Sequence, residues 1–451
     1  MRPHWIEAAA ILATAGTLGL TGCGMSVTAV HEQPPTTAVQ GHVIGGAQPV
    51  ANATLQLYAV SSGGYGTAAT ALFSPAITTS ATGGFTFPSS YCPANASTLV
   101  YLVGTGGQPA GAGAGITNNN LALMAALGPC NSLNSSTHIE VNELTTVAAV
   151  WALAPFMSGN TTSYTNVGTS STNATGLQLA FAAVNEVVNP STGQLPGTLP
   201  GGATLPTNEI NTLADILSYC INSGGGTAND SSNCGKLFGY APNTAGSTYP
   251  TDTITAAMNI AQNPARNVPQ LNALTPTTPP FQPTLGATAP AAWTVAINYT
   301  GGGLNAPTAI ATDQSGNVWV ANSGGSSVSQ LTNSGAPNSA FGASGVALGG
   351  EPAGIAIDLT GNGWATTSAN NVVEVTSGGS VGSTLTGNGL STPTSIAIDG
   401  GGLLWVVNSA SGANSVSAFT SSGGVVTGSP FTGSGIASPA GIAINGQANA
   451  N

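Results

Sequence analysis

One short motif recurs four times in the last third of this 451-residue chain. Each copy carries a proline, then an Ile-Ala pair and an Asp or Asn, and the copies occupy residues 306–313, 351–358, 392–399 and 438–445. Successive prolines lie 45, 41 and 46 residues apart, and a tryptophan follows each of the first three copies with the first two of those spacings. A period in the low forties with short apolar runs predicts the blades of a β-propeller.

The pattern within one repeat predicts four short strands. Residues 309–312 and 317–321 are short, apolar and partly β-branched, and the turn from Asp313 to Gly316 joins them into a hairpin. A third alternating strand follows at 328–331, with a weaker fourth strand after it. We expect Asp313 to accept hydrogen bonds from turn amides and Gly316 to tolerate positive φ, so the repeat acids are interpreted as structural. The repeat positions with expected structural roles are Pro307, Asp313, Trp319, Asn322, Pro352, Asp358, Trp364, Pro393, Asp399, Trp405, Asn408 and Pro439.

The run from Pro307 to Asn322 resembles the NHL repeat of bacterial six-bladed propellers, including their streptogramin-lyase-like branch. The resemblance covers roughly residues 293–451. The second copy departs from it with Gly363 before the tryptophan and Thr367 in place of the asparagine, and the third has Leu403-Leu404 in place of Asn-Val. For the lyase branch, the resemblance implies a histidine acid or base and a metal held by acidic residues.

The residue content of the repeats argues against several functions. The four histidines, at positions 4, 31, 42 and 138, all precede the repeats, so these blades cannot supply a histidine base. No Lys or Arg follows Arg266, which removes the main driving force for nucleic-acid binding. No glycine-rich loop carries the Lys-Ser/Thr of a phosphate site, so nucleotide binding has no support. We therefore expect a non-catalytic protein without a cofactor or metal.

Three copies and the start of a fourth do not close a propeller, which typically needs four to eight blades. The segment from Trp293 to Ile297 reads as an isolated strand able to complete a last blade. Because an open sheet edge promotes aggregation, the favoured hypothesis is that the sequence is part of a longer protein. The alternative is an open array, or one completed by oligomerisation.

The first residues predict export and lipid attachment. Arg2 and His4 precede an apolar stretch at residues 8–20 that is too short to span a bilayer, and Leu20-Thr21-Gly22-Cys23 resembles a bacterial lipobox. The resemblance implies cleavage before Cys23, lipid on its sulfur, and anchoring at the outer membrane or cell surface. An ordinary secreted signal is the alternative. With 3 Lys+Arg against 14 Asp+Glu, attachment to a membrane would depend on the lipid rather than on basic patches.

Four further cysteines, Cys92, Cys130, Cys220 and Cys234, are an even number in a chain expected to be exported, which predicts disulfides. Three connectivities are possible. The pairs Cys92 with Cys130 and Cys220 with Cys234 are favoured because each falls within one candidate domain. A metal site or reactive thiol is the less favoured alternative, since there is no CxxC spacing or nearby histidine.

The chain between the tether and the repeats changes character once. Alternating strands with glycine turns at 41–87 resemble the carboxypeptidase-regulatory-like β-sandwich. Apolar residues then recur at helical spacing over the segments 143–153, 177–188, 209–221 and 253–261. Asn142, Asn208 and Thr251 are candidate helix N-caps.

His138, Glu140 and Glu143 form the one cluster whose spacing resembles a metal site. The favoured interpretation is structural, because an acid at a helix N-terminus interacts well with the helix dipole and His138 fits a solvated strand position.

The predicted fold is multidomain and mainly β, with incomplete NHL-type propeller blades, a small β-sandwich and a helical domain between them. The expected parts are a lipoprotein signal peptide (1–22), a tether (23–40), a β-sandwich (41–130), a helical domain (131–275), a Pro-rich linker (276–292) and propeller repeats (293–451). The predicted function is a cell-surface binding platform for an envelope protein or glycan. The alternatives are a streptogramin-lyase-like enzyme with its catalytic residues in further blades, and a structural adhesin.

Overall fold

The computed structural model describes residues 38–444 except 89, 90, 94, 96, 160–162 and 434. The predicted signal peptide, Cys23 and nearly all of the predicted tether lie outside the described residues, as does Asn445 of the fourth repeat copy. Among the helices that the structure describes, none has the length and apolar character needed to cross a membrane.

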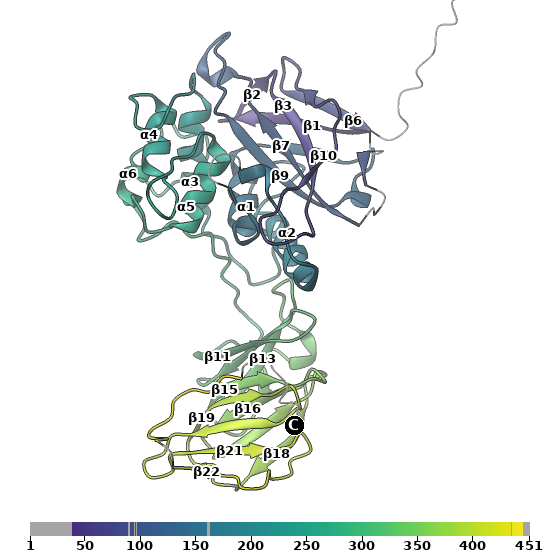
Figure 1. The fold of residues 1–451 in the computed structure, drawn as a ribbon, viewed down its shortest axis with the longest axis vertical. Coiled ribbons are helices and arrows are strands. Elements are labelled where there is room, and N and C mark those ends of the chain that lie inside the picture. Colours follow the sequence, from purple (N-terminus) through teal and green to yellow (C-terminus); the bar gives the residue numbers. More distant parts are fainter. Residues whose placement is uncertain are drawn as a thin grey trace, which may run out of the picture. The chain divides into compact units, whose positions relative to one another are not determined.

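The strands between residues 38 and 141 form two five-stranded sheets (Figure 1). They are β1 (Ala38–Gly45), β2 (Gln48–Ala51), β3 (Thr54–Ala59), β4 (Thr70–Ala71), β5 (Ile77–Thr78), β6 (Gly84–Pro88), β7 (Leu99–Thr105), β8 (Gln108–Pro109), β9 (Ala122–Pro129) and β10 (His138–Val141). One sheet has the order β10-β1-β2-β8 with β6 also on β1, and the other has the order β4-β3-β7-β9 with β5 also on β3. In β1, Val39 and Val43 are buried and alternate with more exposed residues, as a sheet with one covered face requires.

The α-helices that the structure describes are α1 (Glu143–Leu153), α2 (Ala174–Val187), α3 (Thr207–Ile221), α4 (Asn233–Tyr240), α5 (Thr253–Gln262) and α6 (Val268–Asn272). Four of these helices, α1, α2, α3 and α5, lie at the segments where the apolar spacing predicts them, whereas α4 and α6 were not predicted. Asn142 caps α1, and its side chain accepts a hydrogen bond from the Thr145 amide at 2.9 Å. The predicted caps Asn208 and Thr251 are wrong by one or two positions, since Pro206 precedes α3 and Asp252 caps α5.

A single hydrophobic core joins these strands and helices. The expected boundary between residues 130 and 131 falls inside it, because β10 pairs in parallel with β1 and α1 packs on β9. Trp293 is also fully buried in this core. The segment 293–297 therefore forms no blade strand, contrary to the sequence interpretation, and its tryptophan lies in the core that the first two sheets share with the helices.

Both disulfides join the local pairs that the sequence favoured. Cys92 is bonded to Cys130, and Cys220 is bonded to Cys234. The second disulfide links the end of α3 to the start of α4. The sulfurs of these four cysteines are therefore bonded to one another rather than available as metal ligands.

Residues 307–432, which we call the blade array, form three antiparallel four-stranded sheets (Figure 1). Blade one contains β11 (Pro307–Thr312), β12 (Val318–Asn322), β13 (Ser327–Leu331) and β14 (Val346–Ala347); blade two contains β15 (Pro352–Ile357), β16 (Gly363–Thr367), β17 (Asn371–Val375) and β18 (Val381–Thr386); blade three contains β19 (Pro393–Ile398), β20 (Leu404–Asn408), β21 (Ser415–Phe419) and β22 (Phe431–Thr432). The predicted four strands per repeat and the mainly β fold class with a helical region are confirmed.

Candidate binding face and candidate metal centre

Each described blade contains the same hydrogen-bonded aspartate and tryptophan. The indole N–H donates to Oδ2 of the aspartate six residues earlier, at 3.1 Å for Trp319 and Asp313 and at 2.9 Å in blades two and three. Asp313 Oδ1 also accepts from the amides of Ser315 and Asn317 in the turn. Gly316 completes this turn with φ of 79°. The aspartate therefore fixes both the hairpin turn and the ring orientation of its tryptophan.

These contacts set the ionisation of the three repeat aspartates, Asp313, Asp358 and Asp399. Partial burial acts to raise the pKa of each carboxyl, but hydrogen bonds from the indole and the turn amides outweigh it and lower the pKa below its usual value of 3.8. Each carboxylate is thus ionised and occupied by donors of its own blade.

The oriented tryptophan packs onto the next blade. Trp319 shares a core with Ile355 of blade two, and Trp364 shares one with Ile396 of blade three. Gly363 lies directly under the ring of Trp319, because a Cβ at this position would be 2.8 Å from the indole Cε3 atom. The departure of blade two from the repeat pattern at Gly363 is explained by this close contact.

The asparagines at the ends of the second strands anchor neighbouring loops. Asn322 accepts from the Asn305 amide and donates to Ser329 at 2.9 Å. Asn408 makes the matching bonds to residues 391 and 417. Thr367 replaces them in blade two, where its hydroxyl accepts from the Ala369 amide at 3.2 Å.

Blade one presents the same tryptophan-accepting face without a tryptophan on it. Strand pairing places Ile310 opposite Val320, as Ile355 is placed opposite Ala365 and Ile396 opposite Val406. Yet Ile310 is 68% exposed, whereas Ile355 and Ile396 are only 8% and 7% exposed. Among the residues that the structure describes, no tryptophan covers Ile310 in the way that Trp319 and Trp364 cover Ile355 and Ile396.

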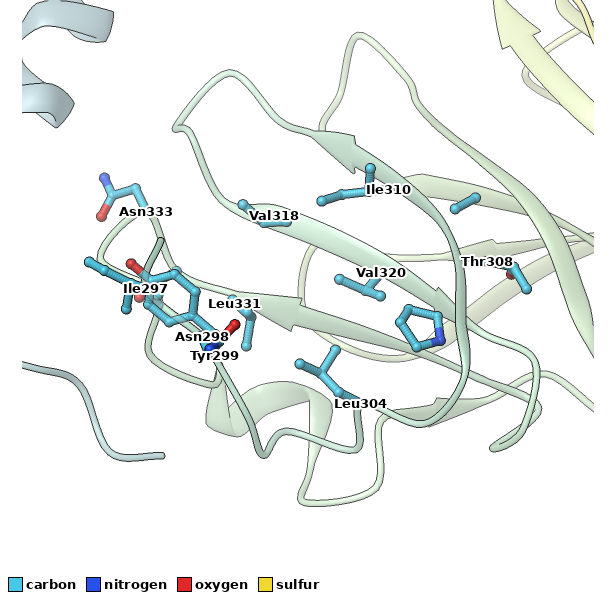
Figure 2. Close-up of a pocket in the computed structure, with 14 residues that line it drawn as sticks. Ile297, Asn298, Tyr299, Leu304, Thr308, Ile310, Val318, Val320, Leu331 and Asn333 are labelled. Carbon is cyan, nitrogen blue, oxygen red and sulfur yellow. The ribbon is translucent and has the colours of Figure 1, made fainter. Parts of the chain in front are cut away.

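A pocket of about 630 Å³ lies on this face (Figure 2). Its lining includes Ile310, Val318, Val320 and Leu331 from blade one, and Leu304 from the segment that leads into the blade. We call the surface formed by these five residues the open blade face. This surface is suited to an aliphatic or aromatic side chain rather than to a charged group, because all five of its side chains are aliphatic. Asn298, Tyr299 and Asn333 add polar groups to the same pocket.

The structure changes the membership of the predicted metal cluster. His138 and Glu140 lie together on β10, but the third member is His42 on β1. Glu143 is separate from them, fully buried, and accepts a hydrogen bond from the Gly46 amide at 2.7 Å. His42 escaped the sequence reasoning because 96 residues separate it from His138, and the parallel pairing of β1 with β10 was not predicted.

Two buried carboxyls are the strongest electrostatic feature of the helical region. Burial raises the pKa of Glu143 to about 8, opposed by hydrogen bonds from its own amide and that of Gly46 and reinforced by Asp215. Burial also raises the pKa of Asp215 to about 7, against a hydrogen bond from the Phe281 amide. Each group has one oxygen without a hydrogen-bond partner. Protonation removes the charge that burial disfavours, so both acids are compatible with the core when they are protonated. The stability of this region should therefore depend on pH.

No protein-family model matches the chain, and the comparison with curated proteins found no match. Among solved structures, virginiamycin B lyase from Staphylococcus aureus is 21% identical with a TM-score of 0.23, over 27% of this chain and 40% of that one. Hydrazine synthase from Kuenenia stuttgartiensis is 18% identical with a TM-score of 0.25, over 27% of this chain and 35% of that one. A putative gluconolactonase is 17% identical with a TM-score of 0.22, over 28% of this chain and 50% of that one.

This chain therefore spans about two fifths of the length of the virginiamycin B lyase that it matches. At these identities and TM-scores the similarities carry no argument about fold or activity, and the assignment of propeller-type blades rests on the three four-stranded sheets of the blade array.

Proposed function

We propose that this chain is an exported, lipid-anchored protein of the bacterial cell envelope whose blade array is a non-catalytic platform for binding another protein. The observation that carries the proposal is the open blade face, where Ile310 is 68% exposed. Charged residues make up only 4% of the chain, so an apolar face of this kind is the feature best suited to drive association. Lipid on Cys23 would hold this face at the envelope.

A protein is favoured over a glycan as the partner because of the chemistry of the open blade face. Val318, Val320 and Leu331 offer no hydrogen-bonding side-chain groups, whereas buried sugar hydroxyls need partners. Of the polar residues that also line the pocket, Tyr299 and Asn333 already donate to Glu186 and Ser315. The equivalent faces of blades two and three contact tryptophan, which supports a partner that inserts an aromatic side chain.

The repeat carboxylates support a binding role rather than a catalytic one. Asp313, Asp358 and Asp399 each accept from an indole and from turn amides, so their oxygens already hold structural donors. A lyase of the streptogramin type would need its acid, base and metal ligands elsewhere.

The test is a photo-crosslinking amino acid placed at position 310 of the full chain in its native host, or in a bacterium that supplies the same envelope. We expect a saturable cross-link to one envelope protein other than this chain. Addition of the purified Ile310→Ser chain as a competitor should not reduce this cross-link. The matched control is position 381, since Val381 is also exposed, at 49%, but lies on β18 away from the open blade face.

Cross-links only to this same chain would overturn the proposal, because the face would then serve contacts between blades or between copies. Cross-links only to a glycan would replace the protein partner with a glycan. Loss of cell attachment on deletion, without any cross-linked partner, would favour a structural adhesin.

The anchor is tested separately by mass spectrometry of the N-terminal peptide from membrane extracts. We expect this peptide to begin at Cys23 and to carry lipid on its sulfur. A peptide that begins elsewhere, or an unmodified Cys23, would refute the anchor and leave the binding face untouched.

A further inference from the structure

Two histidines and a glutamate that lie far apart in the sequence meet on one face of the first sheet. Strands β1 and β10 pair in parallel, with His42 opposite Glu140 and Gln40 opposite His138. Because side chains alternate along a strand, His138 and Glu140 point to the same side of β10. The pairing then places His42 beside both of them.

The three side chains converge through specific atoms. Glu140 Oε1 lies 2.8 Å from His138 Nε2 and 3.1 Å from His42 Nδ1. One ligand atom from each of the three residues lies within 4.8 Å of the other two. The side chain of Glu140 is 18% exposed, whereas those of His42 and His138 are 43% and 40% exposed. The Glu140 carboxylate is thus mostly buried, whereas both imidazole rings are exposed enough to change rotamer.

The composition of the chain makes this convergence informative. The whole sequence contains four histidines and seventeen charged residues, from 3 Lys+Arg and 14 Asp+Glu. Both histidines that the structure describes contact the same glutamate. In a surface made mainly of Ser, Thr, Asn and Gly, two imidazoles and a carboxylate at one point are a concentration of metal-ligating chemistry.

Open space lies beside the cluster. A pocket of about 560 Å³ is lined by His42 and His138 together with Ser80, Phe85 and Thr86. An ion held by the three side chains would therefore keep a coordination position accessible to water or to a small ligand.

We propose that His42 Nδ1, His138 Nε2 and Glu140 Oε1 bind one divalent transition-metal ion of the zinc type. Two imidazoles and one carboxylate are a donor set that Zn²⁺ takes in proteins, with bonds of roughly 2.0–2.2 Å and a fourth position free for water. Tetrahedral bonds of that length separate the ligand atoms by roughly 3.3–3.6 Å, so Glu140 Oε1 moves away from each ring nitrogen by roughly 0.2–0.8 Å. The exposed rings allow this movement.

Metal binding at this point would have a structural consequence. The ion would join β1, where the first sheet begins, to β10, which leads directly into α1. His42 and Glu140 are 98 residues apart, so the site would hold together distant segments of the chain. This inference is independent of the proposed binding of a partner by the blade array.

The test is calorimetric titration of the full chain with Zn²⁺ after removal of bound metal by a chelator. We expect one site per chain, with an affinity that His42→Ala, His138→Ala and Glu140→Gln each lower at least about tenfold. Zn²⁺ should also raise the melting temperature of the native chain but not that of the three variants. Co²⁺ in the same site should give the intense visible absorption of a four-coordinate ion.

Two controls separate this site from other ligands. Glu351→Gln removes an exposed carboxylate elsewhere and should leave the affinity unchanged. A chain carrying His4→Ala, His31→Ala and Cys23→Ala lacks the remaining histidines and the predicted lipid-bearing thiol, and should still bind one ion. The proposal is overturned if this chain binds no Zn²⁺, or if the three site variants, shown to be folded by circular dichroism, bind as tightly as the native chain.

Discussion

Replacing Glu143 by glutamine should change how the stability of the helical region depends on pH. Burial raises the pKa of Glu143 from 4.5 to about 8, so the folded chain binds a proton here that the unfolded chain releases. The stabilisation is therefore fully present below pH 4.5 and is lost as the pH rises through about 8. With 1.36 kcal/mol for each pKa unit, the loss between about pH 5 and about pH 8 is about 3.5 kcal/mol.

Glu143→Gln cannot ionise, and its side-chain oxygen can still accept from the Gly46 amide. We expect the variant to be equally or slightly less stable than the native chain near pH 5, at a cost of about 1 kcal/mol or less. Near pH 8 it should be the more stable protein by about 2 to 3 kcal/mol. Asp215 remains in both proteins, so its own titration largely cancels in the comparison.

Urea unfolding followed by helical circular dichroism measures this difference. Among the described residues every α-helix lies between Glu143 and Asn272, so the signal reports the region that contains Glu143. Glu351→Gln, which removes an exposed carboxylate, should follow the native pH profile. Parallel native and Glu143→Gln profiles would refute the assignment of a raised pKa to Glu143.

Three further changes test the blades and a disulfide. Asp358→Ala should destabilise blade two by about 1.5 to 3 kcal/mol, because it removes the charged acceptor of the Trp364 indole. The pKa of Asp358 is lowered in the folded chain, so this contribution is fully present above pH 3.8 and is lost as the pH falls below 3.8 through the lowered pKa. Native and Asp358→Ala chains that unfold at equal midpoints at neutral pH would contradict this prediction. Gly363→Val should cost about 1 to 3 kcal/mol in thermal unfolding because its Cβ would meet Trp319, whereas Gly441→Ala, with open space around it, should have little effect. Removing the Cys220–Cys234 disulfide by double alanine substitution should cost about 3 kcal/mol, and an unchanged urea midpoint would exclude that loop-closure estimate.

The repeat pattern predicts the blades well because each blade is built from local contacts. The turn at Asp313 to Gly316 joins strands that are adjacent in the sequence, and the alternation of apolar residues sets their faces. The constant six-residue spacing between Asp and Trp was also visible in the sequence. Its meaning was missed because a hydrogen bond from an indole ring depends on side-chain orientation, which spacing alone does not specify.

Features that depend on distant segments were harder to predict. The separation into a β-sandwich and a helical domain overlooked β10, a four-residue strand that pairs with β1 across a long intervening sequence. The same pairing brings His42 to Glu140. Trp293 was assigned to a blade from its local pattern, yet its large apolar side chain is buried in the core that the first two sheets share with the helices. In each case tertiary burial decided between structures that the local sequence allowed.

The blade array offers two complementary surfaces, and their joint behaviour distinguishes partner binding from array closure. Trp319 and Trp364 are 0% and 1% exposed because a following blade covers them, but Trp405 of blade three is only half-buried and stacks on Phe431. Further blades or a second copy that closes the array would cover Ile310 and Trp405 together. The face around Ile310 can receive a tryptophan from a preceding blade, and Trp405 can pack onto a following blade. A separate partner on the open blade face would protect Ile310 alone. Residue-resolved radical footprinting of the envelope-bound protein, compared with the purified chain, should therefore show protection at Ile310 with Trp405 unchanged; equal protection of both would reject partner binding and establish closure of the array.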